Sequence, residues 1–442
     1  MINQLVLIIP LILLISWFLV FNKKILFWIW LWQLKEYHIG RFLAHFSTEK
    51  GRKLIFNPIL ALKVSLLIYF LLILHFFQSD EQYFSITLML IIALVYILYF
   101  IEGIKVLADI YRRQLKIPVL TKKTFLIIAI VVLSEVLILA FILGYPFMFF
   151  LAADIFSLLI ATLCVGIVQP FSNLWRKKII KKATEKRAQF GNLIVIGITG
   201  SYGKTSVKEI LAHVLSSKFR VLKTKEHQNS EVGVSQCILN ELKPEHEIFV
   251  AEMGAYNKGG IKLLSGIINP KIGIITGING QHMATYGSQE NIIRTKFELI
   301  DALPENGIAV FNRDSRLVVV NAKPQNMKSI FCSSKEKVDF WAEEVNIKTD
   351  SVSFIAFSKD GDSAPFRTDL LGSQNIVNIL MAAAAAKELG MNLKEISQAC
   401  SSIKPEQGAI QLKKGINGLN VIDSTYSANP EGVIADLDYL RI

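Results

Sequence analysis

A glycine-rich segment in the second half of the chain carries the side chains best suited to chemistry. It reads Thr199-Gly200-Ser201-Tyr202-Gly203-Lys204-Thr205-Ser206 and directly follows the apolar run Leu193–Ile198. Glycines let backbone N–H groups close around phosphate oxygens, the lysine of such a loop reaches the β- and γ-phosphates, and a threonine hydroxyl can bind Mg²⁺. We therefore predict a nucleotide site formed by Thr199, Gly200, Ser201, Gly203, Lys204, Thr205 and Ser206.

The elements around this loop must hold it in a strand–loop–helix unit. The run before it predicts a buried strand, and apolar residues follow it at helical spacing: Val207, Ile210, Leu211, Val214 and Leu215. The strict phosphate-loop motif has a glycine where this chain has Ile198, so the assignment depends on this context. Gly197 and Gly200 bracket that position instead.

Two further side chains at predicted strand ends could hold a metal ion. Short apolar runs at 247–252, 271–276 and 307–312 alternate with helical stretches, which predicts a doubly wound α/β sheet with ligands at the carboxyl ends of its strands. Glu252 closes the first of these runs, and His282 follows the second closely. On the chemistry alone, a magnesium site and two structural side chains are both open interpretations.

The rest of this half has its own patterns. Residues 338–371 alternate in polarity around a Lys359-Asp360-Gly361-Asp362 turn, which predicts a small antiparallel subsheet. Residues 372–389 read as an alanine-rich helix that stops at Gly390. The predicted fold is an α-helical membrane region followed by an α/β part, a mostly parallel, doubly wound P-loop sheet with that subsheet.

The first 189 residues differ in composition from the rest. Hydrophobic residues make up 52% of the 442 residues, charged residues only 19%, and residues 1–189 carry the whole formal charge of +12. Five apolar runs are long enough to cross a bilayer: 5–21, 59–77, 84–101, 125–143 and 147–168. The loops between them alternate between basic and free of positive charge, which places the N-terminus outside and everything after 168 in the cytoplasm.

Composition also bears on partners and compartment. Residues 190–442 have no net charge, which argues against a nucleic-acid partner and leaves the lipid bilayer as the partner of the basic half. The four cysteines are too far apart in sequence for a CxxC pair. They indicate free thiols in a reducing compartment.

Several features of the apolar half are open to two interpretations. Ile25–Trp32 carries three tryptophans, which favours an interfacial helix in the headgroup layer; the alternative is that it extends the first span at a tilt. Lys63 lies near a helix end, from which we expect its amine to reach water. Glu135 and Asp154 lie nearer mid-span, where they could bind a headgroup or hydrogen-bond between helices. Residues 175–189 predict a basic linker helix on the anionic inner leaflet.

Six segments of the second half resemble the Mur ligase family, the ATP-dependent amide ligases of peptidoglycan synthesis. Their order and spacing agree with that family from about Asn192 to the C-terminus. The segments are GITGSYGKTS (Gly197–Ser206), NSEVGV (Asn229–Val234), EMGAYNKGGI (Glu252–Ile261), HMATYGSQENIIRTKFEL (His282–Leu299), GSQNIVNIL (Gly372–Leu380) and DSTYSANPEG (Asp423–Gly432).

The resemblance implies ATP and Mg²⁺ as cofactors and gives roles to individual residues. Lys204, Lys296 and His282 would be catalytic, and Thr205, Glu252, His282 and Lys296 would hold magnesium, with Lys296 carbamylated. Asn375 would contact adenine, and Asp423 would lie near the ribose. The partners would be a cell-wall precursor, nucleotide- or lipid-linked, and an amino acid or dipeptide.

Departures from the family pattern bear on substrate choice. Gln374 stands where the family usually has histidine, Ser424 replaces a second acid, and Ala409 replaces a common arginine. The expected domains are a five-span region (1–170), a basic juxtamembrane linker (171–191), a central ATP-binding domain (192–416) and the start of a shortened C-terminal domain (417–442). We therefore expect the chain as given to bind ATP without completing amide formation.

Three functions follow from these observations. The leading hypothesis is a membrane-embedded ligase that activates a carboxylate as an acyl phosphate for attack by an amine, in peptidoglycan or cell-envelope synthesis. A membrane-anchored polyglutamate- or cyanophycin-type ligase is a second hypothesis. A non-catalytic ATP-binding membrane scaffold is the third, and the presence of Glu252, His282 and Lys296 together argues against it.

Overall fold

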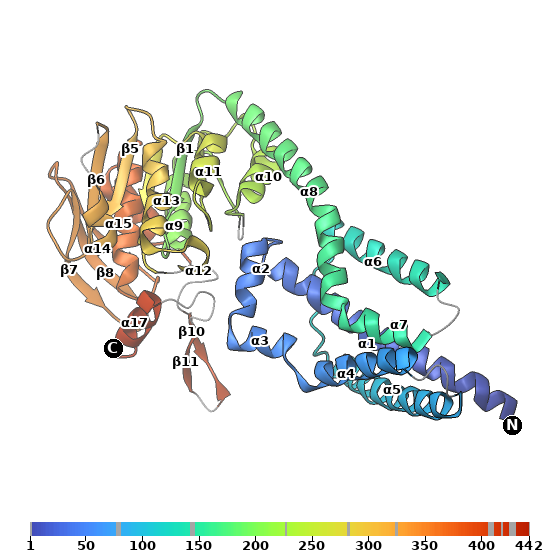
Figure 1. Cartoon of the computed structure of the whole chain (residues 1–442). Coiled ribbons are helices and arrows are strands. Elements are labelled where there is room, and N and C mark those ends of the chain that lie inside the picture. The colour runs from blue at the N-terminus through green and yellow to red at the C-terminus, as the bar shows by residue number, and fades with distance from the viewer. Residues whose placement is uncertain are drawn as a thin grey trace. The chain divides into compact units, whose positions relative to one another are not determined.

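The computed structural model describes residues 2–76, 81–141, 146–225, 228–280, 283–322, 326–404, 411–416, 419–423 and 430–441 (Figure 1). The chain divides into two compact units, residues 1–175 and residues 176–442. Each unit has its own hydrophobic core. The boundaries that we predicted for four domains remain a prediction.

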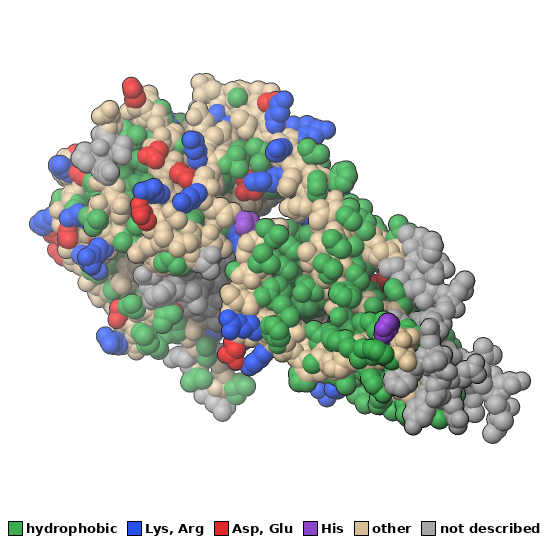
Figure 2. All heavy atoms as spheres, in the orientation of Figure 1, with side chains coloured by type: hydrophobic (Ala, Val, Ile, Leu, Met, Phe, Trp, Pro, Cys, Tyr) green, Lys and Arg blue, Asp and Glu red, His purple; other side chains and the backbone are tan. Residues whose placement is uncertain are grey.

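The first unit is entirely helical in its described part. Its helices are α1 (Ile2–Leu34), α2 (Ile39–Phe46), α3 (Glu49–Ile55), α4 (Pro58–Phe76), α5 (Glu81–Tyr111), α6 (Lys122–Phe141), α7 (Pro146–Ile155) and the beginning of α8 (Ser157–Ala188). Four stretches of the described helices are long and apolar enough to cross a membrane: Leu11–Leu34, Glu49–Phe76, Ser85–Tyr111 and Ser157–Ala188. Figure 2 shows apolar side chains covering much of the visible surface of this unit.

Two expectations for the apolar half differ from the structure. Ile25–Trp32 is part of the continuous helix α1, and Trp28 and Trp32 are buried, so this segment extends the first apolar run and is not an interfacial helix. Both indoles donate hydrogen bonds to α8, to Ser157 (3.3 Å) and Thr162 (3.2 Å). The run 147–168 is divided at Phe156 between α7 and α8.

Lys63 does not reach water. Its side chain is fully buried and forms ion pairs with Asp154 of α7 and Glu102 of α5. Lys24 of α1 pairs with the other oxygen of Asp154 at 2.7 Å. The expectation of a snorkelling lysine was wrong because the compensating charges lie 39 and 91 residues away in sequence. This group of two cations and two anions, in which Lys63 and Asp154 are fully buried, joins four helices.

The second unit is built on a nine-stranded sheet. Its strand order is β2-β3-β1-β4-β5-β6-β7-β8-β9. All neighbours from β2 to β7 are parallel, and β7–β8 and β8–β9 are antiparallel. The strands are β1 (Ile194–Thr199), β2 (Val221–Lys223), β3 (Ile248–Glu252), β4 (Ile272–Ile275), β5 (Ile308–Asn312), β6 (Lys328–Ser333), β7 (Phe340–Ile347), β8 (Val352–Ser358) and β9 (Ser363–Thr368). The predicted mostly parallel sheet is confirmed, and its antiparallel part continues the same sheet.

Helices cover both faces of this sheet (Figure 1). They are α9 (Lys204–Ser216), α10 (Glu231–Glu241), α11 (Gly260–Ile268), α12 (Met283–Tyr286), α13 (Gln289–Asp301), α14 (Arg316–Asn321), α15 (Gln374–Lys387) and α16 (Leu393–Cys400). Side chains alternate along a strand, so Ile196 and Ile198 pack against α9 and α15, whereas Val195 packs in the core of α10 and α11. Burial on both faces explains the continuous apolar runs in the strands.

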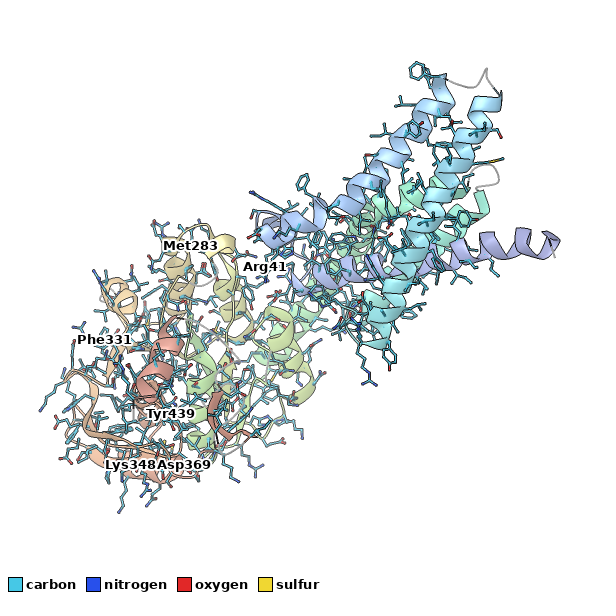
Figure 3. The ribbon with its side chains drawn as sticks, turned by 90° about the horizontal axis from the view of Figure 1, so that it is seen from below. Arg41, Met283, Phe331, Lys348, Asp369 and Tyr439 are labelled. Atoms are coloured by element: carbon cyan, nitrogen blue, oxygen red, sulfur yellow. The ribbon has the colours of Figure 1, made fainter. Side chains whose placement is uncertain are left out.

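The end of the described chain forms a separate hairpin and helix. β10 (Gln411–Lys414) pairs antiparallel with β11 (Asn420–Asp423), and α17 runs from Pro430 to Tyr439. Tyr439 is buried against Leu371, and its hydroxyl donates to the Thr349 carbonyl. Figure 3 labels Tyr439 in the second unit.

The second half of α8 belongs to the second unit. Ala183 is fully buried among residues of α10 and α11, and Ile180 packs beside it. The Arg187 guanidinium is buried and donates to backbone carbonyls of Ile268 and Phe190. This face of the predicted juxtamembrane linker is therefore occupied by protein and is not free to lie on lipid.

Candidate nucleotide-binding site

The loop after β1 is shaped by close contacts with the neighbouring strand. A Cβ on Gly200 would lie 2.1 Å from the Thr276 hydroxyl oxygen, so only glycine fits beside that side chain. The Thr276 hydroxyl donates to the carbonyl of Tyr202 (2.5 Å), and the Ser201 N–H donates to the Gly277 carbonyl (2.6 Å). The end of β4 therefore holds the loop in its folded-back path.

The loop leads into the N-terminus of α9. Gly203 precedes the first helical residue with a φ of 78°, a left-handed conformation that favours glycine, and no side chain caps the helix there. The first N–H groups of a helix have no partner within it, and the helix dipole favours negative charge at this end. The loop and helix together therefore offer backbone donors to an anion, as the sequence pattern predicts.

Gly197 has a different role from the one its position suggests. It lies inside β1, where a Cβ would approach the Met253 sulfur to 2.8 Å and a Leu299 methyl carbon to 2.9 Å. It therefore allows close packing of the sheet against α13 and does not form part of the loop.

A hydroxyl and a carboxylate meet beside the first turn of α9. The Thr205 hydroxyl donates to Glu252 Oε2 at 3.0 Å, and the Asn229 amide donates to Glu252 Oε1 at 3.1 Å. The buried Lys208 ammonium lies 3.6 Å from Glu252 Oε2. Glu252 closes β3, which neighbours β1, so the sheet order brings these side chains together.

These oxygens fit a magnesium ion. Mg²⁺ is bound in proteins through one or two carboxylates or hydroxyls, with the remaining positions filled by substrate phosphates and water. Thr205 and Glu252 supply such a pair. Within the described residues no group of three or more His, Cys, Asp or Glu side chains lies together as a metal cluster.

Two lysines line a small cavity next to this pair. The cavity has a volume of about 60 Å³ and is lined by Gly200, Ser201, Lys204, Asn229, Gly254, Ala255, Tyr256, Tyr286, Ile292 and Lys296. Lys204 folds back so that its amine donates to the Ser201 carbonyl at 3.2 Å. Lys296 comes from α13 and is only 5% exposed. Two cations from distant parts of the sequence therefore face one polar cavity.

Burial changes the protonation of both lysines. It lowers the pKa of Lys204, and the nearby Glu252 carboxylate partly opposes this. Burial and, to a smaller extent, the charge of Lys204 together lower the pKa of Lys296 to about 7. A neutral amine at Lys296 is thus accessible near neutral pH.

Asn375 is buried next to the same loop. Its amide donates to the Leu371 carbonyl at 2.8 Å, and its oxygen accepts from the Asn378 amide at 3.2 Å. Asn378 in turn lies against Gly203, where a Cβ would approach its oxygen to 3.1 Å. α15 therefore places the Asn375–Asn378 pair beside the loop through its packing on α9.

The remaining predicted site residues have different positions. Ser206 is half-buried in the first turn of α9, and the Thr199 hydroxyl donates to the Met253 carbonyl at 3.0 Å. Asp423 lies on β11, where its carboxylate pairs with Lys413 at 2.5 Å, and it is not among the described residues that line the cavity. His282 lies outside the described residues, so its predicted roles stay predictions.

Three contributors were missed by sequence reasoning. Thr276 is the last residue of a predicted strand that neighbours β1. A polar side chain at the carboxyl end of such a strand could have been recognised from the sequence as a candidate site residue. Asn229 is the first residue of the segment Asn229–Val234, which we identified without assigning a role to Asn229. Asn378 lies in the identified segment Gly372–Leu380 but was given no role, because only the packing of α15 on α9 brings it to the loop.

Comparisons with known proteins agree with this geometry. Residues 198–386 match the family description "Mur ligase middle domain". This segment of the chain is therefore similar to that domain. The UDP-N-acetylmuramoyl-tripeptide–D-alanyl-D-alanine ligase of Mycobacterium bovis is 32% identical over 265 residues, which cover 59% of this chain and 52% of that protein. The chain spans about half the length of the curated relatives it matches.

Solved structures of Mur ligases are similar to this chain in fold. MurF from Acinetobacter baumannii is 28% identical, with a TM-score of 0.57 over 60% of this chain and 58% of that one. The MurF ligase from Thermotoga maritima in complex with ADP is 29% identical, with a TM-score of 0.54 over 60% of this chain and 61% of that one. The predicted resemblance to the Mur ligase family in the second half of the chain and the predicted fold class are thereby confirmed.

Proposed function

We propose that this protein is an ATP-dependent amide ligase of the Mur type, held in a membrane by its first unit. The observation that carries the proposal is that Lys204 and Lys296 line one cavity. Asn229 lines it too, and its amide donates to the Glu252 carboxylate that accepts from Thr205. The names of the relatives support the reaction class, since they are ligases of peptidoglycan precursors.

The loop and α9 would bind the triphosphate of ATP. Free N–H groups at the start of α9 and the Lys204 ammonium would bind the β- and γ-phosphates. Thr205 and Glu252 would hold Mg²⁺, which when bound would neutralise negative charge on the transferring phosphoryl group. Asn229 keeps Glu252 oriented for this by its 3.1 Å hydrogen bond.

The reaction would have two steps. A carboxylate oxygen of the acceptor attacks the γ-phosphorus, the bond to the β-bridging oxygen breaks, and ADP leaves. A neutral amine then attacks the acyl carbon, phosphate leaves, and the amine loses a proton as the amide forms. Lys204 would stabilise the charge that moves onto the ADP and phosphoryl oxygens during the first step.

Lys296 would take part as a carbamate. Its buried amine faces the same cavity as Lys204, and a neutral amine adds CO₂ to give a carbamate and a proton. The product carries an anionic oxygen in place of a second buried cation, which suits a cavity that would also hold a metal ion. His282, as a further metal ligand and catalytic residue, remains part of the proposal.

The acceptor would be a cell-wall precursor. The relatives' names suggest a UDP-muramoyl tripeptide as the acid and D-alanyl-D-alanine as the amine. Because four stretches of the described chain could cross a membrane, a lipid-linked or membrane-proximal form of this acceptor fits the chain. The loop charges would place the ligase unit in the cytoplasm, where ATP is available.

Topology can be tested separately from catalysis. A reporter fused after Gln189 should lie in the cytoplasm, because the segment before it is basic. A reporter inserted at residues 78–82 should lie on the other side of the membrane, because that segment has no positive charge. Cleavage of the 176–187 segment by protease added outside intact cells would contradict this orientation.

The first step can be tested without the amine. The full chain in detergent should exchange label between ADP and ATP only when the acceptor carboxylate is present, because acyl phosphate formation is reversible. Lys204→Ala should lose this exchange, whereas Lys394→Ala, a change at an exposed lysine, should keep it. Exchange that does not depend on the carboxylate, or that survives Lys204→Ala, would contradict the proposal.

A further inference from the structure

The two segments that link the apolar helices at one end of the first unit form a single surface, which we call the basic collar. It consists of residues 35–56, which include α2 and α3, and residues 111–123. Both parts contact the end of α1. The side chain of Gln33 pairs with the backbone of Val119 through two hydrogen bonds (2.9 and 2.7 Å), and Lys123 lies 3.6 Å from the centre of the Tyr37 ring.

α2 has an apolar stripe that is only half covered. Phe42 is buried and stacks on Trp32 of α1, with 3.9 Å between ring centres. Ile39 and Leu43 lie on the adjoining part of the stripe and are 65% and 60% exposed. The helix therefore presents a strip of large apolar side chains that α1 does not cover.

Large apolar side chains are also exposed in the rest of the collar. Val119 and Leu120 are 72% and 75% exposed, although Gln33 holds the backbone of Val119 through two hydrogen bonds. Phe56, at the end of α3, is 79% exposed. Large apolar side chains on fixed backbone indicate a surface that is covered in use.

The charge of the collar is strongly positive. It holds ten Lys and Arg residues against Glu36 and Glu49, a net of +8. Lys50 and Arg52 on α3, and Arg112 and Arg113 after α5, are all exposed. Figure 3 labels Arg41 on α2, within this surface.

We propose that the basic collar binds the headgroup layer of an anionic phospholipid membrane. Its apolar side chains would enter the boundary between headgroups and acyl chains, and its cations would contact lipid phosphates and anionic headgroups. Because the collar connects α1 to α4 and α5 to α6, it continues the apolar surface of those helices. The inference rests on the membrane part of the proposed function and adds the lipid class.

Other occupants fit these residues less well. A nucleic acid would use the cations and leave the exposed Ile39, Leu43, Val119 and Leu120 without a partner. An acidic protein could contact both the cations and the apolar side chains. The collar continues helices that are long enough to span a bilayer, which favours lipid.

The test uses the purified full chain in neutral detergent. We would measure its unfolding midpoint with added phosphatidylglycerol, phosphatidylcholine or a soluble acidic peptide. We expect phosphatidylglycerol to raise the midpoint by about 4 °C or more above phosphatidylcholine. The variant R52Q/R112Q/R113Q should lose this difference, and R52K/R112K/R113K should keep it. K335Q/K348Q/K394Q removes three exposed charges from the second unit and should also keep it.

Equal effects of the two lipids would overturn the inference, as would a full phosphatidylglycerol effect in R52Q/R112Q/R113Q. An acidic peptide as effective as phosphatidylglycerol would assign the collar to a protein partner instead. Extraction of cell membranes with alkaline carbonate tests membrane embedding by itself, so a failure of the collar proposal can be distinguished from a failure of the proposed function. A chain released by carbonate refutes membrane embedding, whereas a retained chain without lipid preference refutes only the collar.

Discussion

Lys296 should react with CO₂ at neutral pH in a way that an ordinary lysine does not. Its pKa is lowered to about 7, first by burial and then by the charge of Lys204. At pH 7 about half of its amine is neutral, compared with about 1 in 3,000 for a lysine with the ordinary pKa. Only the neutral amine adds CO₂, so the reactive form at Lys296 is enriched about a thousandfold.

The assay is carbon-13 NMR of the full chain equilibrated with labelled CO₂. We expect a carbamate signal from Lys296 beside that of the chain's α-amino group, whose ordinary pKa is about 8. Because a lowered lysine pKa means that the proton is lost as the pH rises through about 7, the Lys296 signal at fixed CO₂ pressure should grow between pH 6 and 8. Lys296→Met should remove it, and Lys394→Met, at an exposed lysine, should not.

Two results would refute this reasoning. The wild-type chain could show no carbamate signal at pH 8 other than that of the α-amino group, which would mean that the Lys296 amine is protonated or closed to CO₂. Alternatively, both signals could persist in Lys296→Met, which would place the second reactive amine elsewhere.

Three further predictions follow from single contacts. Lys204→Ala should weaken Mg-ATP binding by about 10- to 150-fold in a fluorescent-nucleotide assay, because a charged hydrogen-bond donor is lost; unchanged affinity would exclude the loop as the phosphate site. Gly200→Ala should weaken it about tenfold or more, because the new Cβ would lie 2.1 Å from the Thr276 hydroxyl oxygen; wild-type affinity would show that the loop can move aside. Lys63→Met or Asp154→Asn should each destabilise the first unit by about 3–5 kcal/mol, because an uncompensated buried charge remains. Replacing both residues by apolar ones should cost less stability, and single variants that melt at the wild-type temperature would contradict the buried pairing.

Local sequence patterns predicted most of the secondary-structure elements of the second unit. The strand–loop–helix unit, Glu252 at its strand end and the alanine-rich helix all follow from residues that neighbour each other in sequence. β2 was missed because three residues, Val221–Lys223, are too short for a periodic signal. β6 was missed because Lys328–Ser333 mixes polar and apolar residues without strict alternation.

Contacts over long sequence distances could not be predicted in the same way. The expectation for Lys63 used its distance from a helix end, and no local rule could supply its pairing with Asp154 91 residues later. The tryptophans of Ile25–Trp32 resemble an interfacial belt in composition, but Trp28 and Trp32 bond to α8. Asn378 reaches Gly203 only because α15 packs on α9.

The measurement that tests the central claim most directly is a structure of the full chain with Mg²⁺ and a non-hydrolysable ATP analogue. Our account predicts that Lys204 and the first N–H groups of α9 contact the β- and γ-phosphates, and that the metal ion is bonded to Thr205 and Glu252. A nucleotide bound elsewhere, or phosphates at this loop with Glu252 turned away from the metal, would contradict the account.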